Sequence, residues 1–96
     1  MRKITELAVD AFVNGYKFRK DNTSVEVDPD GTVNMFLHGS RIAKKTTEGT
    51  EITLAGWNTM LTRERLNGIP GVNLVRKHDE TFLNGSSICS SGWFKI

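Results

Sequence analysis

The sequence predicts an α+β fold in a single small domain spanning residues 1–96. Three patterns lead to this prediction: a helical apolar period at the start, alternating apolar residues between turn signals in the middle, and a turn-to-helix block before a last alternating stretch. A chain of 96 residues has room for one core only. In chain order we expect an N-terminal amphipathic helix, an antiparallel four-stranded meander, a short helix, a C-terminal β-hairpin and a terminal strand.

The first helix is predicted from apolar residues that recur on one face. These residues are Ile4, Leu7, Ala8, Ala11 and Phe12. Asn14 and Gly15 supply a helix stop. The basic residues that follow, Lys17, Arg19 and Lys20, are interpreted as charges at the negative end of the helix dipole.

The four strands of the meander are predicted from alternation between turns. Residues 23–27, 33–37, 41–46 and 50–55 alternate, and turn-forming residues separate them at 28–31, 38–40 and 48–49. In the third strand we expect Ile42 and the alkyl part of Lys44 to share a face. Short links between sequential strands favour antiparallel pairing.

The block from Ala55 to Gly68 predicts a turn followed by a short helix. Thr59 or Thr62 can cap the helix, and Asn67 with Gly68 ends it. Trp57 is expected to anchor the block against the sheet.

The remaining residues predict a second hairpin and a last strand. Alternation over 72–77 and 81–83 flanks a turn at 78–80. The segment 93–96 is apolar enough to be a terminal strand pinned to the sheet.

Composition bounds the class of protein. With 38% apolar and 25% charged residues the chain is globular rather than disordered. The net charge of +2 is unevenly spread, because residues 23–40 carry −3 while residues 41–77 carry seven basic and three acidic side chains. A dipolar surface suits an anionic partner, although a merely solvated basic face is the alternative.

Cysteine usage and the N-terminus bear on location. Cys89 is the only cysteine, which excludes an intramolecular disulfide and a Cys-rich metal site and fits a reducing cytoplasm. The first 18 residues read as neither a signal peptide nor a membrane helix, because their apolar runs are short and acids interrupt them. We expect no membrane partner.

The sequence contains no recognisable catalytic or cofactor-binding signature. Cys89 has no neighbouring histidine in sequence, and His38 and His78 lie in different predicted turns without ligand-spaced acids. No Gly-rich phosphate loop is present. We therefore expect no enzyme, no cofactor and no metal; a hydrolase would need a cleft joining a histidine to Cys89 or to a carboxylate.

The basic middle of the chain supplies the candidate contact residues. Arg63 sits in the first turn of the predicted helix, where the dipole disfavours a cation, which indicates a nearby anion. An internal pair of an arginine with Glu64 or another acid is the alternative. The candidates for contact with nucleic acid or another partner are Arg41, Lys44, Lys45, Thr59, Thr62, Arg63, Arg65, Arg76 and Lys77.

Several motifs resemble a small protein family of tailed phages, prophages and some plasmids. They are LHGSRIA (37–43), ITLAGWNT (52–59), TRERLNG (62–68), FLNGSSI (82–88) and SGWFKI (91–96), and the resemblance runs from about Asn22 to the C-terminus. It implies a phage origin and carries no activity with it. The cytoplasm of the infected bacterial host is then the expected location.

Two functions fit these observations. One is a non-enzymatic phage accessory protein that binds nucleic acid weakly, with little sequence preference, through a basic helix and hairpin surface. The alternative is a protein-interaction module that binds or inhibits a host factor through the acidic hairpin at Glu26–Asp30 or the threonine-rich turn. Exposed strand edges would also allow pairing between copies.

Overall fold

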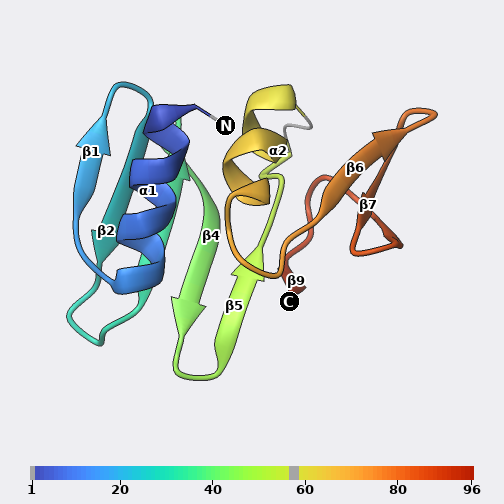
Figure 1. Ribbon diagram of the computed structural model, residues 1–96. Coiled ribbons are helices and arrows are strands. Elements are labelled where there is room, and N and C mark those ends of the chain that lie inside the picture. The colour runs from blue at the N-terminus through green and yellow to red at the C-terminus, as the bar shows by residue number, and fades with distance from the viewer. Residues whose placement is uncertain (1, 57–58) are drawn as a thin grey trace.

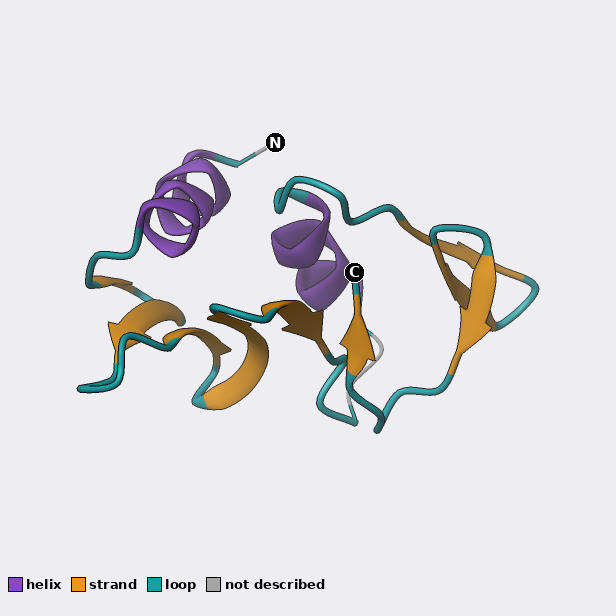
Figure 2. Ribbon diagram, turned by 90° about the horizontal axis from the view of Figure 1, so that it is seen from below, coloured by secondary structure: helices purple, strands orange, loops and turns teal. Residues whose placement is uncertain are grey.

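Two helices lie on one face of a large antiparallel sheet, and a smaller sheet stands beside them (Figures 1 and 2). A computed structural model describes residues 2–56 and 59–96 of the chain. The prediction that Trp57 anchors the second helix therefore lies outside the described residues. The larger sheet contains six strands in the order β1-β2-β3-β4-β5-β9, and the smaller one has the order β6-β7-β8.

The α+β class and the predicted order of elements are confirmed. The helices are α1 (Lys3–Asn14) and α2 (Met60–Asn67). The strands are β1 (Phe18–Lys20), β2 (Thr23–Val27), β3 (Val33–Leu37), β4 (Ser40–Thr46), β5 (Gly49–Ile52), β6 (Leu74–Lys77), β7 (Glu80–Leu83), β8 (Ser86–Ile88) and β9 (Phe94–Lys95).

The predicted meander corresponds to β2 through β5, and the sheet extends it on both sides. At one edge β1 pairs with β2, so Arg19 and Lys20 lie in a strand rather than simply at a helix end. Phe18 pairs with Val25 and packs against the core, which ties this short segment to the sheet. At the other edge β9 pairs with β5, which confirms that the terminal strand is pinned to the sheet.

Helix α1 ends as expected. Gly15 adopts the left-handed conformation with φ 76°, and its N–H donates to the carbonyl of Ala11 at 2.8 Å. The face that packs on the sheet includes Ala8, Ala11 and Phe12, each at most 1% exposed.

A β-bulge in β4 changes which side chains face the core. Met35 pairs with Ala43, while the next residue of β3 pairs with Arg41, so Ile42 is the extra residue. Both Ile42 and Ala43 are buried. The expectation that Ile42 and Lys44 share a face is therefore wrong, because the bulge reverses the alternation between them.

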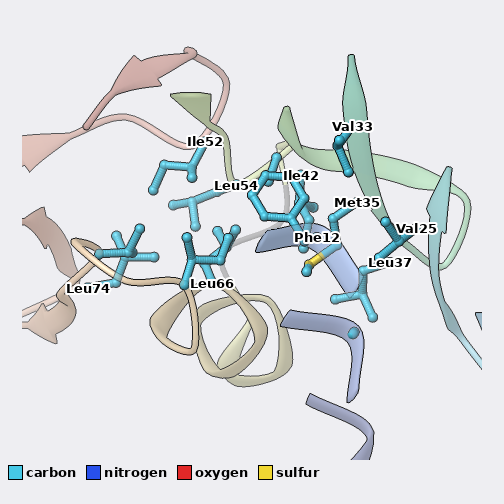
Figure 3. Close-up of a cluster of buried hydrophobic side chains, with 14 of the residues drawn as sticks. Phe12, Val25, Val33, Met35, Leu37, Ile42, Ile52, Leu54, Leu66 and Leu74 are labelled. Carbon is cyan, nitrogen blue, oxygen red and sulfur yellow. The ribbon is translucent and has the colours of Figure 1, made fainter. Parts of the chain in front are cut away.

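The core lies between the sheet and the two helices (Figure 3). Phe12 from α1 lies among side chains of the sheet that include Met35 and Ile42, and Leu66 extends the cluster from α2. Burial of an apolar side chain of this size contributes about 1.5–3 kcal/mol. This cluster joins residues from both ends of the chain.

Helix α2 is capped by Thr59, which settles the choice between the two predicted caps. Its hydroxyl oxygen accepts from the Thr62 N–H at 3.1 Å. At the other end Gly68 has φ −74°, so it does not adopt the left-handed stop. A Cβ on Gly68 would lie 2.7 Å from Val9 Cγ2, and so this glycine permits the close approach of α2 to α1.

The second hairpin, β6 and β7, is confirmed, and β8 adds a third strand to it. This small sheet is tied to α2 by Asn67. The Asn67 amide nitrogen donates to the Leu74 carbonyl at 3.0 Å, and its oxygen accepts from the Leu74 N–H at 2.6 Å. One side chain thus reproduces the pairing that a neighbouring strand would provide.

Candidate functional site

The face of the large sheet opposite the helices is the candidate site. No described helix or strand covers this open face (Figure 2). Cross-strand partners point to the same side of a sheet, so the register defines which residues line it. They are Arg19, Ser24, Glu26, Asn34, Phe36, Arg41, Lys44, Glu51 and Lys95.

Two of these cations lie against one indole ring. The Arg41 guanidinium carbon is 5.2 Å from the Trp93 ring centroid, and Lys44 Nζ is 4.7 Å from it. Each contact of this kind contributes about 0.5–1 kcal/mol at an exposed site. Trp93 therefore holds two positive charges close together on the open face.

Hydrogen bonds fix the Arg41 side chain further. Its Nη1 donates to Asn34 Oδ1 at 3.3 Å, and Asn34 Nδ2 donates to Asp28 Oδ2 at 3.1 Å. Asn34 is only 2% exposed, so the acceptor of the Arg41 bond is a buried side chain. Lys44 is paired more loosely, with Nζ 3.9 Å from Glu51 Oε1.

A hollow of about 650 Å³ lies toward the β1 edge of the same face. Its lining includes Arg19, Ser24, Phe36 and His38, together with the acidic residues Asp21 and Glu26. Arg19 pairs with Ser24, Ser24 with Phe36, and Phe36 with Arg41. A cation, a small polar residue, an aromatic ring and a second cation thus follow one another across four strands.

Of the predicted contact residues, Arg41 and Lys44 are on the open face and Lys45 is not. The Lys45 side chain points to the helix side, where Nζ donates to the carbonyl of Val13 at the end of α1. This bond places a cation at the negative end of the α1 dipole, a role that was expected of Lys17, Arg19 and Lys20.

Thr59 and Thr62 lie at the start of α2, and their hydroxyls are 2.9 Å apart. Thr62 is 3% exposed. Both residues line a cavity of about 330 Å³ whose other walls include Leu37, Ile42 and Leu54. The cap holds the helix, and only Thr59 is exposed at the surface.

Arg65 is an interior group, contrary to its expected place in a contact surface. Arg65 is 1% exposed. Its Nε donates to Thr23 Oγ1 at 3.0 Å, and Nη1 donates to Thr5 Oγ1 at 2.7 Å and pairs with Glu64. The alternative of an internal arginine–acid pair is therefore the one observed for this residue.

Arg63, Arg76 and Lys77 belong to the helix-bearing side and the small sheet. Burial first, and then the positive charge of Arg76, lowers the pKa of Arg63, so these two guanidinium groups interact. Arg76 Nη2 is also 3.2 Å from Asp79 Oδ1. These residues form a second basic region, on α2 and the hairpin.

Sequence reasoning missed the aromatic residues of the open face. Phe36 was detectable, since it follows Met35 in an alternating strand and must point away from the core. Trp93 was not, because its position depends on how the last loop returns β9 to the sheet. Arg19 was assigned to a helix end because its strand has only three residues.

No group of His, Cys, Asp and Glu within residues 2–56 and 59–96 could hold a metal ion. Backbone N–H groups of Ser91 and Gly92 lower the pKa of the exposed Cys89 thiol. None of the described helices is long and apolar enough to cross a membrane.

The fold and its open face define a small α+β protein with a basic, aromatic sheet surface. The chain belongs to the Kyanoviridae Gp96 protein family, a family of phage proteins, whose model matches residues 1–95. This confirms the phage origin that the resemblance implied. No curated protein and no solved structure matches the chain significantly.

Proposed function

We propose that this phage protein is a non-enzymatic nucleic-acid binder that uses the open sheet face, with weak affinity and little sequence preference. The proposal keeps the function expected from the sequence and moves it from the helix and hairpin to the sheet. The observation that carries it is the placement of Arg41 and Lys44 against Trp93.

Charge supports a phosphate backbone as the ligand. The side chains that line the open face include Arg19, Arg41, Lys44 and Lys95, opposed by the carboxylates Glu26 and Glu51. Positive side chains that neutralise phosphates release condensed counterions, and this release drives binding of any sequence. The excess of cations is small, which accounts for a weak interaction.

Preorganisation supports the same ligand. A flexible cation loses side-chain entropy when it binds, at about 0.5–1.5 kcal/mol for each immobilised side chain. Arg41 has already lost part of that freedom through Asn34 and Trp93. It can therefore donate two N–H groups to a phosphate at a lower entropic cost than an unsupported surface arginine.

The test is fluorescence anisotropy with labelled single-stranded and duplex oligonucleotides at several salt concentrations. For Arg41→Ala/Lys44→Ala we expect weaker binding and a shallower dependence of log K on log salt. The slope should fall by about 0.7 for each lost contact to a single strand and about 0.9 for duplex DNA.

Arg76→Ala/Lys77→Ala is the matched control, because it removes the same charge from the small sheet. Thermal unfolding of both variants checks that the fold is retained. Binding that falls only in the hairpin variant would place the interface on the helix and hairpin, and absence of binding at low salt would remove the function altogether.

A further inference from the structure

We infer that the ligand of the open face is single-stranded nucleic acid, held by stacking of bases as well as by phosphate contacts. This inference rests on the proposed function and names its substrate class. The observations behind it are the partly exposed ring of Phe36, the Arg41–Trp93 cation–π pair near it, and the open sheet face that carries both.

Phe36 is an aromatic side chain directed away from the core. The core residues Met35 and Leu37 flank it in β3, so alternation sends the ring to the open face. It is only partly buried there, and it forms a wall of the 650 Å³ hollow. Its neighbour on β2 is Ser24, whose short side chain leaves room beside the ring.

Arg41 connects this ring to Trp93. It pairs with Phe36 across β3 and β4, and its guanidinium lies 5.2 Å from the indole centroid. A guanidinium plane is itself a surface on which a nucleobase can stack. The open face therefore offers two adjacent stacking positions, one on Phe36 and one at the Arg41–Trp93 pair.

Cations border these stacking positions. Arg19 stands on β1, three strand spacings from Arg41, or about 14 Å across the sheet. Phe36 lies between them. A single nucleic-acid strand that crosses the sheet in this direction places phosphates near both arginines and an unpaired base over Phe36.

A duplex does not fit this arrangement as well. Bases in a duplex are stacked on one another and present only their edges, and reading them requires a protruding helix or ribbon that enters a groove. Aromatic residues on a sheet contact unstacked bases instead. The chemistry of the face thus favours single strands of DNA or RNA without selecting among sequences.

The experiment compares four labelled ligands of equal length by anisotropy at low salt. The duplex carries twice as many phosphates as a single strand, so tighter binding of the single strands cannot come from phosphate number. They are a 12-nucleotide oligothymidine, its ribonucleotide counterpart, a 12-base-pair duplex, and an abasic oligomer. A length of about 12 nucleotides falls within the range of about 4–16 nucleotides that known single-strand binding domains occupy. We expect both base-bearing single strands to bind about tenfold more tightly than the duplex or the abasic oligomer.

Variants of Phe36 test the role of the ring. Phe36→Leu keeps an apolar side chain and is expected to lose about tenfold in affinity for oligothymidine while its affinity for the abasic oligomer stays unchanged. Phe36→Tyr keeps the ring and should bind oligothymidine like the parent protein. Circular dichroism confirms that each variant is folded before binding is measured.

The outcomes separate this inference from the proposed function. Equal affinity for the duplex, the abasic oligomer and oligothymidine would overturn single-strand selection and leave phosphate binding intact. No loss of affinity in folded Phe36→Leu would overturn stacking on that residue. Failure to bind any of the four ligands would overturn the proposed function, and this inference with it.

Discussion

The Arg65 guanidinium donates to the hydroxyl of Thr5 at 2.7 Å and thereby joins the two helices through the interior of the protein. A second donor of the same group reaches Thr23 on β2 at 3.0 Å. Glu64 balances the charge and accepts from the Thr5 hydroxyl. The helices and the sheet that carries the open face are thus held by one polar network.

Removal of Arg65 should be among the most destabilising single changes in the chain. Arg65→Ala leaves Glu64 without its counter-charge and opens a cavity, at a cost of about 3 kcal/mol, the low end for one member of a buried pair because Glu64 keeps 25% side-chain exposure. Urea denaturation measures the loss. Arg65→Lys keeps the charge but lacks the fork that serves both hydroxyls, so its stability should be intermediate.

The exposed Arg19 provides the control for this prediction. Arg19→Ala should change the free energy of unfolding by less than about 0.5 kcal/mol. A similar effect for Arg19→Ala and Arg65→Ala would contradict the structural role of the buried guanidinium.

Stability should fall in acid through Glu64. Desolvation, the largest single influence, favours its protonated form, but hydrogen bonds from Thr5, the Arg2 N–H and Arg65 outweigh it and hold the pKa of Glu64 below the ordinary value of 4.5. A carboxyl whose pKa is lower in the folded state contributes stability above its unfolded pKa. That contribution is lost as pH falls below about 4.5 through the folded value.

Urea unfolding at a series of pH values from 7 to 3 measures this effect. Glu64→Gln cannot ionise, so its stability should fall less steeply in acid than that of the parent protein. Identical pH profiles for the two proteins would show that other carboxyls account for the acid sensitivity.

Gly68→Ala should destabilise the protein although the backbone there is helical. At φ −74° an alanine is allowed, and in open surroundings the change would stabilise by about 0.4–1 kcal/mol. Here the new Cβ would meet Val9 Cγ2 at 2.7 Å, so overpacking should cost about 1–3 kcal/mol. The shift in the midpoint of urea unfolding shows whether Gly68→Ala stabilises or destabilises the protein.

The same clash predicts coupling between the two positions. In a Val9→Ala background the methyl group that obstructs the new Cβ is gone, so Gly68→Ala should cost less than it does alone. Equal costs in the two backgrounds would mean that the helices separate freely at this point.

The order of elements could be predicted because α1 and most of the strands carry a periodic apolar signal, while α2 is marked by its capping residue. What the sequence did not reveal depends on contacts between elements. From the sequence, Ile42 is an ordinary inward residue of an alternating strand. The bulge at Ile42 becomes evident only from the pairing of β4 with β3. Strands β1 and β8 have three residues each, too few for alternation to be distinguished from a loop.

The candidate site could likewise be predicted only in part. The distribution of charge along the sequence identified Arg41 and Lys44, but it could not separate Arg63 from Arg65. These two residues are two positions apart on one helix, so their side chains point about 200° apart. Only the packing of the helix determines which of them faces inward. The position of α1 makes Thr5 a partner for Arg65. Trp93 joins the site only because β9 returns to β5.

Asn67 should control the attachment of the small sheet. Asn67→Ala removes both bonds to the Leu74 backbone, and each is worth about 0.5–1.5 kcal/mol. Native-state hydrogen exchange should then show faster exchange of amides in β6 and β7 while those of β3 and β4 are unchanged. Asn73→Ala, at a neighbouring exposed asparagine, should leave exchange as in the parent protein, and a uniform increase in both sheets would refute local attachment.

An added cation on the open face should strengthen nucleic-acid binding more than the same charge elsewhere. Glu26 is exposed on β2, beside the row that runs from Arg19 to Arg41. Glu26→Lys replaces a repulsive carboxylate with a phosphate ligand, so oligothymidine should bind more tightly and the salt slope should steepen by about 0.7. Glu6→Lys makes the same change of net charge on the exposed side of α1, behind the sheet. Anisotropy titrations of both variants at moderate salt decide between a located interface and a general charge effect. At such salt, charges more than about 10 Å away are screened. A located interface therefore requires a larger gain in affinity from Glu26→Lys than from Glu6→Lys, and equal gains would contradict it.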